Sequence, residues 1–190
     1  MCSMINAAVV GVWGMLWLMK TTPVSAAESR VVAAAMMGYF MEELFWPMIT
    51  KKNEQEPPSW SDIIHHVAGI LLISSATLDD IYVSRFPSFA IVEISTVWLN
   101  LGWFAMKDGR TSDDTIKTIG KIFAFSFFVI RCLWIPYASW QSFQLKPFTS
   151  RTHQGVCLGL IVVVCLQFWW MRLVITQILL RAPKGKKGGG

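Results

Sequence analysis

The chain has 190 residues, of which 54% are hydrophobic and only 15% are charged, and its mean hydropathy is +0.46. Soluble domains carry about 25% charged residues, so a soluble protein of this composition would expose large apolar patches, and we predict an integral membrane protein instead. The net charge of +5 comes from scattered basic residues and a basic C-terminal end, without the basic, aromatic-interleaved stripe expected of a nucleic-acid-binding protein.

Six apolar segments that are long enough, or nearly so, to cross a bilayer follow one another at about 4–19, 31–49, 62–77, 86–106, 116–140 and 154–180. Spanning segments must satisfy their backbone hydrogen bonds internally, and these segments lack the alternation of barrel strands. We therefore predict an all-α integral membrane bundle of about six transmembrane helices. It forms one domain over residues 1–181, followed by a basic, glycine-rich cytosolic tail at 182–190.

The first segment has two interpretations. It is short and ends at Lys20, and the following sequence PVSAAES resembles the cleavage region of a secretory signal. Its start, however, lacks the basic residues of such a signal. The segment is therefore either the first transmembrane helix or a signal peptide within residues 1–26.

The basic residues between the segments predict the orientation in the membrane. With six helices both termini lie on one side, and that side holds nine of the basic residues: Lys51, Lys52, Lys107, Arg110, Lys117, Arg181, Lys184, Lys186 and Lys187. The opposite side holds five: Lys20, Arg30, Arg85, Lys146 and Arg151. Since cytosolic loops are enriched in Lys and Arg, we expect both termini in the cytosol.

Several polar side chains fall inside these segments, where an ionisable group is costly and usually faces the bundle interior or a wet cavity. Glu93, Thr96 and Asn100 recur at helical spacing and share one face of the fourth segment. Such a stripe either lines a cavity or joins helices by hydrogen bonds. Two further glutamates, Glu42 and Glu43, lie in the second segment.

Arg131 lies inside the fifth segment. It can neutralise either Glu43 or Glu93, and the pattern alone leaves both pairings open. We treat Arg131, Glu42, Glu43, Thr96 and Asn100 together as candidate lipid-binding or cavity-lining residues.

His65 and His66 are adjacent at the start of the third segment, an unusual place for titratable groups. Neighbouring positions on a helix point about 100° apart, so the pair is poorly placed to bind one metal ion. The four cysteines form no CxxC pair and predict neither a zinc site nor a disulfide framework. We expect no metal and no resident cofactor. A neutral imidazole can still act as a base at cytosolic pH.

Three blocks together resemble the TLC-domain family: GYFMEELFW (38–46), IIHHVAGILL (63–72) and VEISTVWLNLGWF (92–104). The later runs FVIRCLWIP (128–136) and HQGVCLG (153–159) are also similar to the small proteins of that family. The resemblance implies a multi-pass membrane protein that handles lipid. It places the chain in the endoplasmic reticulum, another endomembrane or the plasma membrane.

The family includes the ceramide synthases, whose signature joins two adjacent histidines to a cluster of three carboxylates about 27 residues later. Glu93 stands 27 residues after His66 and matches the first carboxylate, whereas Thr96 and Asn100 stand where the next two are expected. The resemblance therefore assigns candidate catalytic roles to His65, His66 and Glu93. The loss of two carboxylates argues against ceramide synthase activity.

Three functions follow from these observations. The first is a membrane protein that binds or senses lipid and influences membrane lipid composition, without enzymatic activity. The alternative is a ceramide-synthase-type acyltransferase that uses acyl-CoA as co-substrate and a sphingoid base. A third is an adaptor that acts through its loops and tail. Expected partners are membrane lipids, a second copy of the chain or another membrane protein, and no nucleic acid.

Overall fold

The fold was analysed in a computed structural model that describes residues 2–19, 25–50, 59–145 and 150–180. The predicted tail at 182–190 and the basic residues Lys20, Lys51, Lys52 and Lys146 lie outside these ranges. The described chain forms helices only, which confirms the all-α prediction. They are α1 (Cys2–Met19), α2 (Ala26–Thr50), α3 (Trp60–Thr77), α4 (Asp80–Val83), α5 (Phe86–Ala90), α6 (Glu93–Asp108), α7 (Asp113–Phe127), the π-helix η1 (Phe128–Trp134), α8 (Ile135–Phe143) and α9 (Arg151–Leu180).

Side-chain caps explain why helices begin before the apolar segments do. α2 begins about five residues earlier than predicted, where the Ser25 hydroxyl accepts from the Glu28 N–H and Glu28 accepts from the Ser25 N–H. The same reciprocal capping box joins Ser59 and Asp62 at the start of α3. Caps of this type satisfy N–H groups that have no partner within the first helical turn.

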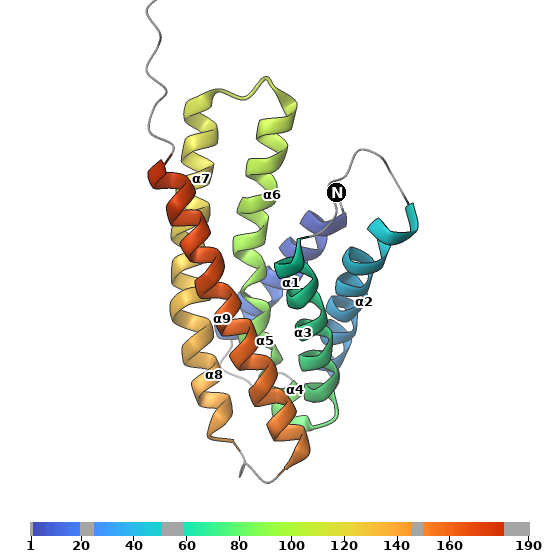
Figure 1. Ribbon diagram of the computed structural model, residues 1–190. Coiled ribbons are helices and arrows are strands. Elements are labelled where there is room, and N and C mark those ends of the chain that lie inside the picture. Colours follow the sequence, from blue (N-terminus) through green and yellow to red (C-terminus); the bar gives the residue numbers. More distant parts are fainter. Residues whose placement is uncertain (1, 20–24, 51–58, 146–149, 181–190) are drawn as a thin grey trace, which may run out of the picture.

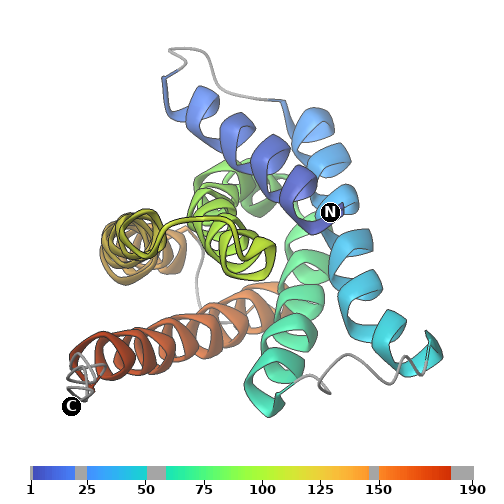
Figure 2. The same cartoon turned by 90° about the horizontal axis from the view of Figure 1, so that it is seen from above.

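The long helices run alternately up and down, as Figure 1 shows. The start of α1, the end of α2, the α6–α7 turn and the end of α9 lie at one end of the bundle. The opposite end holds α4 and α5. Seen from above in Figure 2, α3 and α9 lie side by side, and α6 and α7 form a separate hairpin. Both ends of the described chain therefore lie at the same end of the bundle, as an even number of passes requires. Which side of the membrane that end faces stays a prediction.

Three described stretches are long and apolar enough to cross a membrane: Phe86–Asp108, Asp113–Phe143 and Arg151–Thr176. α1 contributes a shorter apolar helix, Met4–Met19. α2 and α3 carry more polar groups, including the glutamate and histidine pairs. Large apolar side chains cover the outside, among them Leu71 at 62% and Phe125 at 71% exposure. A bundle that is apolar outside and partly polar inside suits a lipid environment.

The fourth predicted segment, 86–106, is not one continuous helix. It divides into α5 and α6 at Ile91 and Val92, where the backbone makes tight bonds such as Val92 N–H to Phe89 O (3.2 Å). The Ser88 carbonyl, which Val92 N–H would bind in an α-helix, instead accepts from the Trp134 indole at 2.8 Å. The interruption is thus stabilised by a side chain from a distant helix.

α1 packs directly on this interruption through two glycines. A Cβ atom at Gly14 would lie 2.8 Å from Ile91 N and 3.0 Å from the Pro87 carbonyl oxygen, and one at Gly11 would lie 2.9 Å from Ile94 N. The obstructing atoms belong to the backbone and cannot rotate away. Small residues that let two helix backbones meet are the usual way to pack helices in a membrane.

The fifth segment contains the wide-turn helix η1. Pro136 has no N–H, and just before it the Ile135 N–H bonds to the Ile130 carbonyl, five residues back. The π-helical turns occupy Phe128–Trp134 and contain Arg131, which is buried at 7% exposure. π-helical turns of this kind occur frequently at functional sites.

We expect Gly14→Ala to lower the stability of the bundle by about 1–3 kcal/mol, because the added methyl group collides with backbone atoms of α5. Gly38→Ala is the matched control, since a Cβ there meets nothing within 4 Å and alanine favours the helix. Thermal unfolding of the purified protein in detergent, followed by tryptophan fluorescence, measures both variants. Equal melting temperatures for the two variants would contradict the proposed backbone contact.

Candidate functional site

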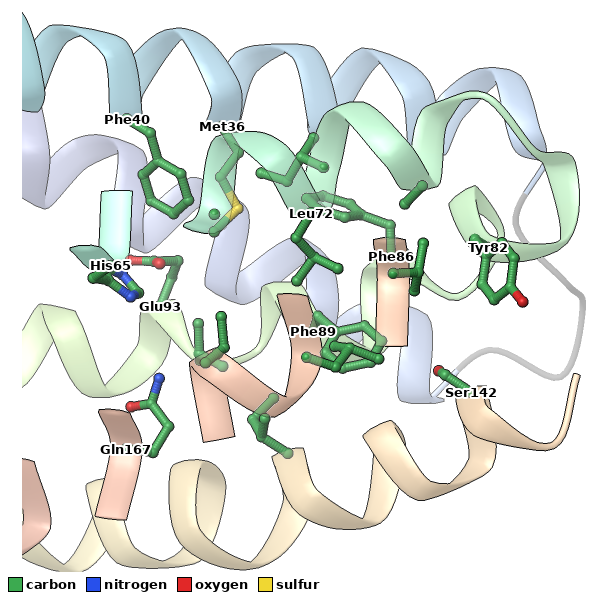
Figure 3. Close-up of a pocket in the computed structure, with 18 residues that line it drawn as sticks. Met36, Phe40, His65, Leu72, Tyr82, Phe86, Phe89, Glu93, Ser142 and Gln167 are labelled. Atoms are coloured by element: carbon green, nitrogen blue, oxygen red, sulfur yellow. The ribbon is translucent and has the colours of Figure 1, made fainter. Parts of the chain in front are cut away.

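A narrow cavity runs inside the bundle and is lined by residues of α2, α3, α4, α5, α6, α8 and α9. Its volume is about 80 Å³, several times what one water molecule needs. Figure 3 shows His65, Glu93 and Gln167 at one end, Tyr82 and Ser142 at the other, and apolar side chains between them. The apolar part includes Met36, Phe40, Leu72, Phe86 and Phe89.

Two antiparallel helices set the length of this cavity. On α3 the lining runs from His65 to Ala76, and on α9 it runs from Val156 to Gln167. Each strip covers 12 residues, so its ends are 11 helical rises apart, about 16 Å at 1.5 Å per residue. That is about half of the ~30 Å hydrocarbon thickness of a bilayer, the depth of one leaflet.

Arg131 joins three parts of the bundle behind the polar end. Its Nε donates to Ser95 Oγ (2.7 Å), and its Nη2 donates to Thr96 Oγ1 (2.8 Å) and to the Val92 carbonyl (3.3 Å). Its Nη1 donates to Gln167 Oε1 on α9 at 3.2 Å. Four of the five guanidinium N–H groups are thereby used within the protein. Arg131 thus fixes the start of α6 against η1 and α9.

Glu93 is the counter-charge of Arg131. It is buried at 4% exposure, its side chain hydrogen-bonds to Thr96, and the positive charge that acts on it is that of Arg131. Because the Thr96 hydroxyl accepts from Arg131, its own proton is available to the Glu93 carboxylate. Glu43 hydrogen-bonds to Tyr39 and lies close enough to His66 and Glu93 for their charges to interact. Of the two pairings left open by the sequence, the structure places Glu93 with Arg131.

The two histidines have different environments. His65 lines the cavity, and its ring packs edge-on against Trp170 (4.9 Å between centroids) and Phe40 (5.6 Å). Its buried Nδ1 makes no hydrogen bond within the described residues. His66 also contacts Phe40 but does not line the cavity, and its charged neighbour is Glu43. His65 is therefore the histidine that a molecule in the cavity would meet.

The remaining candidates lie around this end or away from it. Thr96, Glu43 and Arg131 surround the polar end but do not line the cavity. Asn100 lies one turn further along α6 and is half-buried, and Glu42 is exposed on the outside of α2. Of the three polar residues on one face of α6, Glu93 thus lines the cavity and the Thr96 hydroxyl connects Glu93 to Arg131, whereas Asn100 lies away from the site.

Two residues of the site were missed from the sequence. Gln167 lies in the middle of the long apolar run of α9 and is only 1% exposed. Ser95 is fully buried, between Arg131 and the Val92 carbonyl that its own hydroxyl binds at 2.7 Å. An uncharged polar residue within a lipid-spanning helix is a signal that could have identified Gln167.

A second polar group closes the opposite end of the cavity. The Tyr82 hydroxyl bonds to His153 Nδ1, and His153 Nε2 lies 3.4 Å from Cys157 Sγ. Burial raises the pKa of the Tyr82 phenol, which lies outside the spanning segments, so Tyr82 stays protonated at neutral pH. The described residues contain no group of three or more His, Cys, Asp and Glu side chains that could hold a metal ion.

A family model described as the TLC domain matches residues 1–176. No curated protein and no solved structure matched the chain.

Arg131→Met should destabilise the bundle by about 3–5 kcal/mol, because it leaves Glu93 charged and buried without its counter-charge. Adding Glu93→Gln should recover part of that loss. Arg172→Met is the control, since Arg172 is an exposed cation that packs on Trp169. Thermal unfolding in detergent measures all three proteins. A double variant that is less stable than Arg131→Met alone would contradict the pairing.

Proposed function

The chain belongs to the TLC-domain family of membrane proteins related to lipid metabolism, and on this premise we propose that it binds lipid and influences membrane lipid composition. The cavity is the observation that supports this proposal. A polar group of His65, Glu93 and Gln167 stands at one end of an apolar channel whose length suits one acyl chain. In this binding mode the acyl chain lies along α3 and α9, and the end group of the lipid lies against the polar residues.

The location of the site agrees with a ligand that comes from the bilayer. The outside of the bundle is apolar, so lipid surrounds it. We expect the protein in the endoplasmic reticulum or another endomembrane, or in the plasma membrane, with both termini cytosolic. In this function no cofactor is required, and membrane lipids are the partners.

Val163→Trp tests lipid binding, because Val163 lines the apolar part of the cavity and a tryptophan there fills it. Ile161→Trp is the matched control, since Ile161 lies two residues away on α9 and is 51% exposed. Lipid that copurifies with each protein is measured by mass spectrometry, and cells that produce each variant are compared by untargeted lipidomics. We expect Val163→Trp alone to lose the bound lipid and the change in cellular lipids.

If both tryptophan variants retain the same bound lipid, the cavity is not the binding site. If wild-type protein changes no lipid class in cells, the proposed effect on lipid composition is wrong. Size-exclusion chromatography of both variants separates loss of binding from loss of folding.

One observation favours the alternative, a ceramide-synthase-type acyltransferase. His65 lines the cavity, where a base would be needed, and its Nδ1 has no hydrogen-bond partner among the residues that the structure describes. In that reaction the amine of a sphingoid base attacks the thioester carbonyl of acyl-CoA. A C–N bond forms, the C–S bond breaks, His65 accepts the amine proton, and coenzyme A leaves.

We expect no acyl transfer by the purified protein, because Thr96 and Asn100 replace two of the three carboxylates of the ceramide synthase pattern. The assay uses several acyl-CoAs with a sphingoid base and detects the amide product by mass spectrometry. Product that forms with wild-type protein and is lost in His65→Ala would establish the acyltransferase instead.

A further inference from the structure

We infer that the polar end of the cavity selects a lipid with an uncharged end group that both donates and accepts hydrogen bonds, namely a hydroxyl group. Carboxylate, phosphate and ammonium groups are excluded. This inference rests on the proposed lipid binding and specifies the chemical class of the ligand. The inference depends on the hydrogen-bond donors and acceptors that remain available to a ligand on three side chains: Arg131, Gln167 and Glu93.

Arg131 is not available to an anionic ligand. Its guanidinium makes four hydrogen bonds to Ser95, Thr96, Gln167 and the Val92 carbonyl, and it does not line the cavity. A carboxylate or phosphate is normally bound by two parallel N–H groups of an arginine. Here four of the five N–H groups already have partners within the protein, so no parallel pair of them is left for a ligand and Arg131 has a structural role.

Gln167 presents a donor to the cavity. Its Oε1 accepts from Arg131, which orients the amide so that the –NH₂ group is the part left for a ligand. Figure 3 shows this nitrogen pointing toward the cavity. The side chain is only 1% exposed, so it has no access to bulk water and is held in one orientation. The site therefore offers an N–H donor with a defined direction.

Glu93 presents the complementary acceptor. The side chain lines the cavity at the same end, and its carboxylate hydrogen-bonds to Thr96. Since its charge and that of Glu43 lie close to the polar end, an anionic end group would meet a carboxylate without a free cation to compensate it. Anionic lipids are thus disfavoured by repulsion and by the absence of an available guanidinium.

A cationic end group is disfavoured for a different reason. An ammonium group has three donors and no acceptor, and it needs acceptors around it. The Gln167 –NH₂ group would point its own hydrogens at the cation, and the charge of Arg131, which donates to the Oε1 of the same amide, lies nearby. Glu93 alone would remain as its partner, and that carboxylate is already compensated by Arg131.

A hydroxyl group satisfies both sides of the site. It donates to Glu93 and accepts from Gln167, and the buried Nδ1 of His65 at the same end offers a further partner. The buried polar atoms that a ligand would meet are then paired, which is the condition for binding a polar group in a low-dielectric site.

The test uses photoreactive probes with one chain length, a diazirine in the chain and four end groups: hydroxyl, carboxylate, phosphate and ammonium. Full-length protein in lipid nanodiscs is irradiated with each probe, and labelled peptides of α3 and α9 are identified by mass spectrometry. We expect the alcohol to label the cavity peptides about tenfold more than each charged probe, the factor of about one charge-assisted hydrogen bond. In Val163→Trp the cavity label should be lost.

The outcomes separate the two proposals. If no probe labels the cavity peptides in a Val163-dependent way, the proposed lipid binding fails. If labelling is cavity-specific but a charged probe labels as strongly as the alcohol, lipid binding stands and the selection for a hydroxyl group is wrong.

Glu93→Gln provides a test by gain of binding, which misfolding cannot imitate. Without the carboxylate, the charge of Arg131 has no counter-charge, so the carboxylate probe should label the cavity more strongly than it labels wild-type protein. Glu42→Gln is the matched control, because it removes an exposed glutamate of α2 and should change nothing. Unchanged labelling by the carboxylate probe in Glu93→Gln would overturn the charge argument.

Discussion

A buried guanidinium in a lipid-surrounded bundle is the constraint from which the rest of the structure follows. Arg131 must have its charge compensated and its N–H groups bound, because there is no bulk water inside the bundle to do either. The bundle supplies Glu93 for the charge and Ser95, Thr96, Gln167 and a backbone carbonyl for the hydrogens. Each partner lies on α6 or α9, or just before α6. The contacts that stabilise the Arg131 cation thus hold α6 and α9 in place.

The irregular backbone of η1 and of the break before α6 also helps to accommodate Arg131. The wide turns of η1 contain Arg131, and the break before α6 leaves the Val92 carbonyl available to it. Irregular backbone at membrane depth is tolerated only where it is buried in protein or lines a cavity. Here Trp134 binds the Ser88 carbonyl, and Gly11 and Gly14 of α1 cover the break. Both irregular stretches border the cavity, since Val92, just before α6, and Ile135, just after η1, belong to its lining.

Hydropathy predicted the helices well, because the length of an apolar run reports directly on burial in lipid. Spacing placed Glu93 and Thr96 on one side of α6, and both belong to the polar end. The break at Val92 escaped prediction because an apolar run has the same hydropathy whether or not its helix is interrupted. Gln167 escaped because its role depends on contact with Arg131, 36 residues away, which no local pattern encodes. The Ser25 cap has a recognisable sequence pattern, but it lies outside the apolar segment that was used to predict the helix.

The residue at position 96 decides what kind of chemistry the polar end suits. A carboxylate there would take Arg131 as its direct partner and leave Glu93 with an uncompensated charge, which favours a raised affinity for protons or for a cationic substrate. Threonine instead accepts from Arg131 and bonds to Glu93, so one cation and one anion balance each other through a neutral hydroxyl. Because the charges of Arg131 and Glu93 compensate each other, neither group readily gains or loses a proton, and the directions of their hydrogen bonds are fixed. The threonine at position 96 thus supports the proposed recognition of a lipid end group over the alternative of acyl transfer.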